Sequence, residues 1–578
     1  MDILSIISFV GFTGLVAFIA WYATKGTDEN SAKGYYLGGR SLGAITIAGS
    51  LLLTNLSAEQ IVGLNGQSFT EGVLVMAWET LAAIAMIFTA IYLLPKYMRS
   101  GITTIPEFIQ DRFDHQTKSI LSILFLIAFG VVLLPTILYS GSVAFSTMFD
   151  LPTVLNISKS TVIWLCVWAI GIIGIIYAIF GGLKAVAISD LVNAIGLLIG
   201  GILIPVFGLL LIGNGDFFEG LDILWEKNPQ KFNAIGEVDA SIPFGTIFTG
   251  MMIAQMYYWG TNQSILQRVF GAKSLKEGQK GMILAGFVKF LIPVIVVLPG
   301  IIAWHIFNGN LENSDQAYPA LVRKVLPGAY LGFFAAVLFG AVLSSFNSLL
   351  NSSATLFGFD LYKQYFNKNA SEKDTVKAGK IFGLFLALLA MIISPFIANA
   401  PDGLFSYIQQ ALGSLSVPIL AVVAIGIVTK HVPAKAAKLV LVGGVLMYLM
   451  SLLIFQPYFT KKALDHNEMK SSRFLKKLKG EKAIKYFKEI NISEEDIPAY
   501  IKKVRIVEAK AYPHFLHIMG ILFVLNILIM LFIGKLKPEK KVYIPKITEE
   551  IDITPWKHAK LVGVIITILV LSTYFIFK

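Results

Sequence analysis

Charged side chains are scarce in this chain. Only 15% of its 578 residues are Asp, Glu, Lys or Arg, whereas soluble proteins average about 25%. Hydrophobic residues make up 56%, and the mean hydropathy is +0.71. This balance excludes an ordinary soluble domain and predicts a polytopic membrane protein in the cell membrane, in contact with lipid.

Cysteine and familiar catalytic motifs are also nearly absent. The single cysteine, Cys166, lies in an apolar run, which excludes an intrachain disulfide and indicates a buried small hydrophobe. The sequence contains no HExxH motif, and its GxSxG match, residues 39–43, lies in a loop before an apolar run, so we expect neither an enzyme nor a bound cofactor. The first apolar run begins at Asp2 without a basic region before it, and we interpret it as a retained span.

Long apolar runs are abundant instead. A helix needs about 20 such residues to cross the hydrocarbon, and helices are the spanning structure that fits continuous runs of this length. The sequence predicts fourteen transmembrane helices, near residues 3–23, 43–64, 73–95, 119–146, 161–180, 185–213, 243–267, 280–305, 329–362, 376–398, 404–428, 435–456, 514–534 and 558–577.

The distribution of Lys and Arg predicts the orientation. Short connections after odd-numbered spans carry most of them, so both termini are expected outside. The connection at 461–512 disagrees, because it holds 14 Lys and Arg against 8 Asp and Glu. Long connections translocate largely regardless of charge. We interpret this basic extramembrane extension as a solvated accessory segment or a contact for anionic headgroups, not as a nucleic-acid site.

Two spans have an unusual polar composition. Residues 50–67, SLLLTNLSAEQIVGLNGQ, and the span at 243–267, with QMYYWGTNQ, place amides and hydroxyls at membrane depth. Such groups cost free energy unless something binds them. Each of these two spans is the first of a block of five spans, 43–213 and 243–428. Because five is an odd number, the second block is inverted in the membrane relative to the first. Paired discontinuous helices of this kind indicate a transporter binding site; an ordinary bundle lined by two polar helices is the alternative.

Other polar residues in the spans allow more than one interpretation. Lys289 can snorkel to water or form a buried, hydrogen-bonded ammonium. Asp190 fits a capping or interhelical role, with ion handling as the alternative. The run from Ser344 to Ser353 holds five serines and two asparagines. Single serines often bond back to their own helix, but this many hydroxyls could also bind a hard monovalent cation.

These stretches together carry a family resemblance. NLSAEQIVGLNG, MAWE, QMYYWGTNQSILQR, GFVKFLIP, LSSFNSLLNSSATLFGFDLYKQY and FSYIQQ occur in the order and at the spacing of the sodium:solute symporter family, and most resemble its sugar-transporting branch. The resemblance covers about residues 1–456. It implies a LeuT-like fold with a five-plus-five inverted repeat, alternating access, and Na+ as the coupling ion.

The resemblance also implies roles for individual residues. The solute contacts would be Asn55, Gln60, Glu79, Gln255, Tyr258, Lys289 and Gln409. Tyr258 would also be the inner gate, and the outer gate would be Leu64, Trp78 and Phe405. Na+ would be held by backbone carbonyls of Leu53, Leu56 and Ala341 and by the hydroxyls of Ser344 and Ser345, with Asp190 acting in sodium release.

Three departures leave the solute open. Gln255, Trp78 and Ala82 stand where a sugar-transporting member of the family has Asn, Tyr and Ser. We therefore expect a single transporter domain over 1–578 that imports a monosaccharide or sugar derivative. The alternatives are inositol, sialic acid, a carboxylate or an amino acid as the solute, or a sensor on a transporter scaffold. The spans at 3–23, 435–456, 514–534 and 558–577 would be peripheral.

Overall fold

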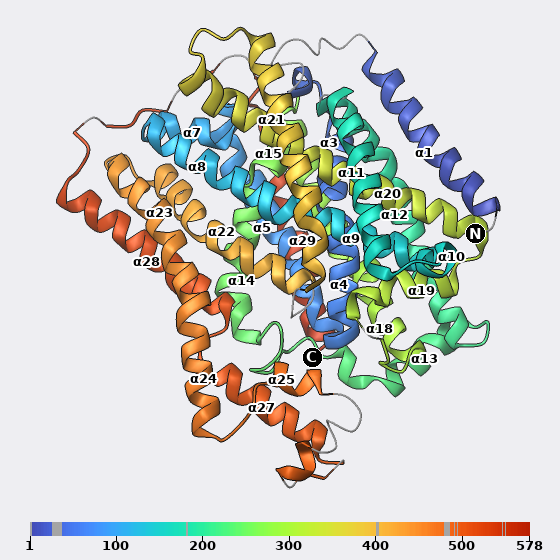
Figure 1. Cartoon of the computed structure of the whole chain (residues 1–578). Helices are drawn as coiled ribbons and strands as arrows, with labels where there is room; N and C mark the ends of the chain where they lie inside the picture. Colours follow the sequence, from blue (N-terminus) through green and yellow to red (C-terminus); the bar gives the residue numbers. More distant parts are fainter. Residues whose placement is uncertain are drawn as a thin grey trace.

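The computed structural model describes residues 3–25, 37–180, 183–311, 313–399, 404–478, 486–490, 492–493, 495–540, 542–545, 547–548 and 551–578. These residues form an all-helical bundle (Figure 1). Two isolated β-bridges, Leu42 with Ala272 and Ser274 with Asp552, tie loops together. The prediction of an all-α membrane protein is confirmed.

Helices occupy each predicted span. They are α1 (Ile3–Thr24), α3 (Ala44–Asn55) with α4 (Ala58–Glu71), α5 (Ala77–Phe88) with α6 (Leu94–Arg99), α8 (His115–Ile127) with α9 (Leu134–Met148), α11 (Lys159–Phe180), α12 (Leu183–Ile212), α14 (Gly250–Gly260) with α15 (Gln263–Phe270), α16 (Leu275–Leu291) with α17 (Pro293–Val296) and α18 (Leu298–Ile306), α20 (Gly328–Thr355), α21 (Glu372–Ile393), α22 (Leu404–Val428), α23 (Ala434–Met450), α28 (Phe515–Leu536) and α29 (Ala559–Ile576).

Not all of these helices are long enough to cross a membrane alone. Within the described residues, 11 helices are sufficiently long and apolar, or up to 12 if the pair bent by 46° at Leu291–Pro293 is one span. The spans at 43–64 and 243–267 fall short because each is broken near its middle. The count of fourteen therefore stays a prediction, and the two interruptions are confirmed.

Helix α3 lies at the centre of the bundle. It packs against α12, α16 and α20, and nine of its twelve residues are buried. Its contact with α12 requires a glycine, because a Cβ on Gly49 would lie 2.9 Å from the Cα of Leu191. At its other end, α3 breaks next to the serine-rich part of α20, where the Ser345 hydroxyl donates to the Thr54 carbonyl.

Apolar side chains are exposed on the outer helices. On α1, Ile3 is 74% exposed, and on α28, Phe532 is 63% exposed. Exposed rows of this kind are the lipid-facing surface of a membrane helix. Helix α1 packs on α12 and α20, whereas α29 packs on α5 and α16.

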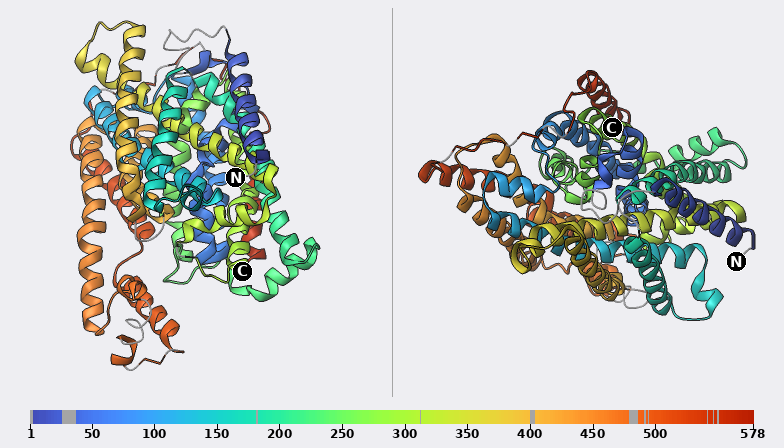
Figure 2. Two further views of the ribbon diagram at one scale, coloured as in Figure 1. Left: turned by 45° about the vertical axis from the view of Figure 1, so that its right-hand side comes forward. Right: turned by 90° about the horizontal axis from the view of Figure 1, so that it is seen from above.

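The basic extension leaves the bundle on a continuous helix. Helix α23 continues through a π-helical turn, Ser451–Phe455, into α24 (Gln456–His466), so the helix ends ten residues later than the predicted span. Beyond it lie α25 (Ser472–Lys477) and α27 (Ile497–Ala511). These elements project past one end of the bundle, the end at which the C-terminus also lies (Figures 1 and 2). We call this end the extension side.

Candidate functional site: a cavity at two broken helices

The first break separates α3 from α4. Leu56 has φ −79° and ψ 56°, and Ser57 is extended, before helix resumes at Ala58. A helix end leaves carbonyl groups without intrahelical partners. The break thus presents backbone oxygens and the side chain of Asn55 in the middle of the bundle.

The second break separates α14 from α15. Thr261 leaves the helical conformation with φ −139°, and the side chain of Asn262 caps α15 by accepting from the Ser264 N–H at 3.0 Å. The Tyr97 hydroxyl donates to the Gly260 carbonyl at 3.0 Å. These contacts satisfy one N–H and one carbonyl at the break, groups that the membrane interior would otherwise leave unpaired.

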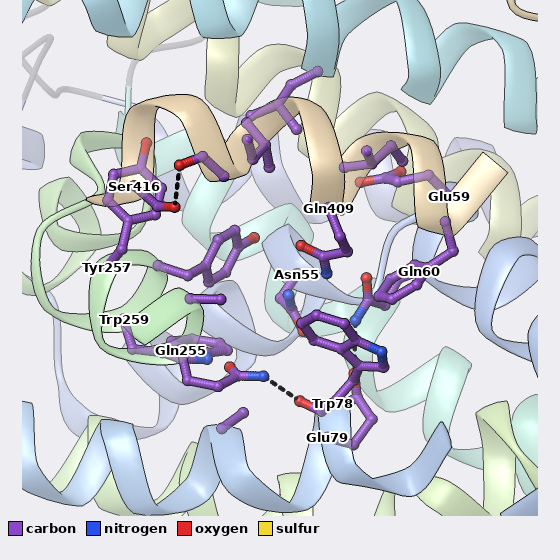
Figure 3. Close-up of a pocket in the computed structure, with 18 of the residues that line it drawn as sticks. Asn55, Glu59, Gln60, Trp78, Glu79, Gln255, Tyr257, Trp259, Gln409 and Ser416 are labelled. Atoms are coloured by element: carbon purple, nitrogen blue, oxygen red, sulfur yellow. Dashed lines mark hydrogen bonds between the residues drawn. The ribbon is translucent and has the colours of Figure 1, made fainter. Parts of the chain in front are cut away.

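A cavity lies between the two breaks, α5 and α22 (Figure 3). Six of the seven predicted solute residues line it, namely Asn55, Gln60, Glu79, Gln255, Tyr258 and Gln409. They come from α3, α4, α5, α14 and α22, segments up to about 350 residues apart. The structure thus brings these residues together; their role in solute binding stays a prediction.

Lys289, the seventh predicted solute residue, lies just behind the cavity wall. Its side chain is fully buried, and its ammonium donates to the Asn55 side-chain oxygen and to a carboxylate oxygen of Glu79. The snorkelling interpretation is therefore wrong, and the buried ammonium is correct. A buried ion pair that also makes hydrogen bonds fixes the geometry of its surroundings.

The amides around the cavity are already engaged. The Gln60 amide donates to the second oxygen of Glu79 at 2.7 Å, and the Gln255 amide donates to the Trp78 carbonyl at 2.7 Å (Figure 3). Glu79 consequently accepts from both Gln60 and Lys289. A solute hydroxyl that enters here would exchange partners within an existing network.

Three buried polar atoms at the cavity have no hydrogen-bond partner within the described chain. They are the Glu59 Oε2, the Trp78 Nε1 and the Tyr257 hydroxyl, and all three residues line the cavity. Unpaired polar atoms are rare in protein interiors and costly. These three atoms are therefore available to pair with a polar group in the cavity.

Three of the four predicted gate residues, Trp78, Tyr258 and Phe405, line this cavity. The rings of Trp78 and Phe405 meet edge to face, with centroids 5.3 Å apart, and both line the cavity. Leu64 is fully buried but is not among the lining residues. Tyr258 lines the wall formed by α14. The gating roles stay predictions.

The predicted sodium ligands converge where α20 crosses the break in α3. The Ser345 hydroxyl donates to the carbonyls of Thr54, at 3.2 Å, and Leu53, at 3.5 Å. Ala341 is fully buried on the same helix. The Ser344 hydroxyl is buried near Asp190 and makes no hydrogen bond of standard geometry. Neutral oxygens of this kind fit Na+, and the assignment stays a prediction.

Asp190 connects two helices. It is fully buried, and one of its carboxylate oxygens accepts from the Ser50 hydroxyl at 2.6 Å, which joins α12 to α3. The interhelical role weighed from the sequence is therefore correct. Its part in sodium release stays a prediction.

Sequence reasoning missed Arg268. This side chain is fully buried and donates to the Thr54 and Ser348 hydroxyls and to the Ser264 carbonyl. It thereby joins α15 to α3 and α20 beside the predicted sodium ligands. Arg268 ends the stretch QSILQR beside a connection predicted to face the cytoplasm, so the sequence indicated only a contribution to the orientation in the membrane. Glu59 was also overlooked, although its place in the polar stretch SAEQ was visible.

Comparisons with known proteins agree with this geometry. The model of the sodium:solute symporter family matches residues 35–446. The chain is 40% identical over 554 residues to the Escherichia coli protein described as uncharacterized symporter YidK, covering 96% of this chain and 87% of that protein. It is 32% identical over 445 residues to the sodium/glucose cotransporter of Vibrio parahaemolyticus, covering 73% and 79%.

A solved structure shares the architecture. The outward-open, substrate-bound structure of a Na+-coupled sialic acid symporter superposes with a TM-score of 0.67 at 17% identity, covering 91% of this chain and 98% of that one. At this identity the likeness concerns the fold. The LeuT-like fold with discontinuous helices is therefore confirmed.

Proposed function

Because the chain belongs to the sodium:solute symporter family, we propose that it imports a neutral, polyhydroxylated solute, most simply a monosaccharide, together with Na+. Members of the family are Na+-coupled secondary transporters, not enzymes. The observation that carries the proposal is the cavity at the two broken helices, whose lining combines amides, carboxylates and aromatic rings.

The chemistry of the lining suits a sugar. Each sugar hydroxyl both donates and accepts, so it can pair with an amide, a carboxylate or an indole N–H. Here the unpaired Glu59 oxygen can accept, the Trp78 N–H can donate and the Tyr257 hydroxyl can do either. The rings of Tyr258 and Trp259 can cover the apolar C–H face of a pyranose.

The charge of the site argues against an anionic solute. Glu59 and Glu79 contribute two carboxylates, and the one ammonium, on Lys289, is already bound to Glu79. A carboxylate ligand would need a free cation or a helix N-terminus. Sialic acid and simple carboxylates are therefore disfavoured, whereas hexoses and inositol remain compatible with the donors and acceptors present.

Na+ coupling follows from the position of the ion site. Leu53 and Leu56, the proposed carbonyl ligands, flank Asn55, which lines the solute cavity and accepts from Lys289. An ion bound between this break and Ser345 would fix the backbone that positions Asn55. Coupling requires only that the two ligands stabilise the same conformation.

Direction of transport follows from the topology. With both termini outside, the extension side faces outward, and Trp78 with Phe405 closes the cavity from that side. Tyr258 closes it toward the cytoplasm. Alternating opening of these two gates would carry solute and Na+ inward.

The test uses the purified full-length protein in proteoliposomes with an inward Na+ gradient. A panel of radiolabelled D-glucose, D-galactose, myo-inositol, N-acetylneuraminate and L-proline is offered singly. We expect accumulation of a hexose or inositol that collapses when K+ replaces Na+. Equal uptake in K+ would exclude Na+ coupling, and accumulation of only the anion or the amino acid would exclude the proposed solute class.

A further inference from the structure

A groove lies between the first turns of α3, α16 and α29, away from the solute cavity. Its volume is about 740 Å³. The residues predicted to bind solute or Na+, or to act as gates, are all absent from its lining. The transport site described above therefore does not account for this groove.

Two helices form its long walls with the same residue spacing. The lining residues are Lys280, Ile283, Leu284 and Phe287 on α16, and Val562, Ile565, Ile566 and Leu569 on α29. Both sets follow the i, i+3, i+4, i+7 spacing that places side chains along one face of a helix. Each face rises about 10 Å along its helix, which is about two thirds of the roughly 15 Å of hydrocarbon in one leaflet.

The groove has a closed floor and an open, apolar rim. Ile283 and Ile566 are buried where α16 packs against α29. At the rim, Ile45 is 67% exposed and Ile565 is 49% exposed. Exposed apolar side chains on membrane helices face acyl chains. The shape therefore fits an acyl chain that lies along the seam between the two helices.

One end of the groove is polar, and we call it the mouth. Glu277 and Lys280 line it from α16, and Trp556 lines it from the segment before α29. A tryptophan beside a lysine is typical of the headgroup level. Because α29 ends at the extension side (Figure 1), its beginning and the mouth lie at the opposite end of the bundle, in connections predicted to face the cytoplasm.

Hydrogen bonds between the three segments fix the mouth. One Glu277 carboxylate oxygen accepts from the Ala44 N–H at 2.9 Å, and the Gln279 side-chain oxygen accepts from the Trp556 N–H at 2.7 Å. The other Glu277 oxygen lies 3.8 Å from the Lys280 ammonium, too far for a hydrogen bond. The ammonium therefore still has donors to offer to an acceptor in the groove.

The mouth is positively charged. Residues 273–280 and 552–560 hold five lysines against two acidic residues, and one of these acids, Glu277, already accepts from the first N–H of α3. The positive end of the α3 dipole lies at the same place. The cytoplasmic leaflet of a cell membrane carries anionic phospholipids. A phosphate group with net negative charge is the headgroup that complements this mouth.

We propose that the groove binds one anionic phospholipid, of the phosphatidylglycerol type. Its phosphate accepts from the Lys280 ammonium and the Trp556 indole N–H, and one of its acyl chains lies between α16 and α29. A lipid bound there ties α29 to the first turns of the two helices that carry Asn55 and Lys289. This inference goes beyond the proposed function, because it does not depend on which solute is carried.

The experiment is native mass spectrometry of the purified full-length protein in detergent. Dipalmitoyl phosphatidylglycerol and dipalmitoyl phosphatidylcholine, which differ only in the headgroup, are titrated separately. We expect one phosphatidylglycerol to be retained per protein, with retention of phosphatidylcholine roughly fivefold weaker. Lys280→Gln should weaken phosphatidylglycerol binding roughly fivefold, the contribution of about one lysine near an anionic surface. Ile565→Trp should weaken binding of both lipids, because the indole fills the groove.

Two matched controls test the location. Lys435→Gln removes an exposed lysine at the start of α23, and Ile568→Trp adds the same bulk to α29 at a position that is 60% exposed and outside the groove. Both should bind phosphatidylglycerol like the wild type. Melting curves without added lipid check that each variant folds, and if one groove variant does not fold, the other decides.

Equal retention of the two lipids by the wild type would overturn the proposal. So would phosphatidylglycerol binding by Lys280→Gln and Ile565→Trp that matches the two controls. Weakening in Ile565→Trp alone would refute the recognition of an anionic headgroup by Lys280. Weakening in Lys280→Gln alone would refute the position of the acyl chain between α16 and α29.

Discussion

The Lys289 ammonium binds the Glu79 carboxylate across a sequence separation of 210 residues. Both side chains are essentially inaccessible to solvent, at 0% and 1% exposure. Glu79 also accepts from Gln60, and Lys289 also donates to Asn55. One ion pair therefore fixes three cavity segments, α3, α4 and α5, relative to α16.

Removal of the cation should harm both stability and transport. Lys289→Met leaves a buried carboxylate without its counterion, and we expect a loss of roughly 3–5 kcal/mol in the free energy of unfolding and no measurable Na+-driven uptake. The double variant Lys289→Met with Glu79→Gln has no buried charge and should recover most of the stability. The apparent melting temperature in detergent measures the change in stability, and Na+-driven uptake into proteoliposomes measures the change in transport. Uptake by the double variant would show that the ion pair has no role beyond folding.

Glu59 should control the charge preference of the site. At an effective dielectric of 20, two unit charges about 10 Å apart repel by about 1.7 kcal/mol. Glu59→Gln should therefore reduce the preference for D-glucose over D-glucuronate roughly 20-fold. Competition against labelled D-glucose uptake measures this ratio. Glu219→Gln, at an exposed helix end, should leave it unchanged, and an unaltered ratio in Glu59→Gln would place this carboxylate outside the solute's reach.

Ser345 should set the sodium dependence. Ser345→Ala removes one proposed oxygen ligand, and we expect the Na+ concentration for half-maximal uptake to rise roughly tenfold, equivalent to about 1.4 kcal/mol. Ser353→Ala is the matched control, because its buried hydroxyl donates back to the Leu349 carbonyl of the same helix at 2.7 Å. If both variants behave like the wild type, the ion binds elsewhere.

Asp315 should give the protein a measurable pH dependence. It lies in the connection between α18 and α20, and burial raises its pKa from 3.8 to about 6. Because the folded state holds the proton more tightly, this residue adds stability at acidic pH, fully present below 3.8 and lost as the pH rises through 6. Between pH 7 and pH 5 the wild type should gain about 1 kcal/mol relative to Asp315→Asn. The melting temperatures of the two proteins at pH 7 and pH 5 measure this gain, and an equal change in both proteins would contradict the prediction.

The topology can be tested with single cysteines. In a Cys166→Ala background, Lys503→Cys on the extension and Lys363→Cys after α20 place exposed thiols in connections predicted to face opposite sides of the membrane. A membrane-impermeant maleimide applied to intact cells should label only the first, and permeabilisation should expose the second. The reverse pattern would invert the topology and place the basic extension on the cytoplasmic side.

The sequence alone determined the class of fold and the positions of the helix breaks. The reason is local: a run such as TNLSAEQ cannot remain in hydrocarbon as a plain lipid-facing helix, so its polarity predicted the interruption that the structure has at Leu56 and Ser57. Apolar run lengths predicted the spans in the same way. The resemblance then assembled a residue set of which six members line one cavity.

Only the tertiary structure decided which polar groups meet. The pairing of Lys289 with Glu79, the burial of Arg268 against Thr54 and Ser348, and the docking of Arg505 on Asp239 and Glu71 join segments that are remote in sequence. Polarity and periodicity report how one helix relates to its surroundings. Neither property indicates which other helix that helix packs against. The packing decides which polar groups become partners, because a buried charge is tolerated only where a complementary group lies within hydrogen-bonding distance.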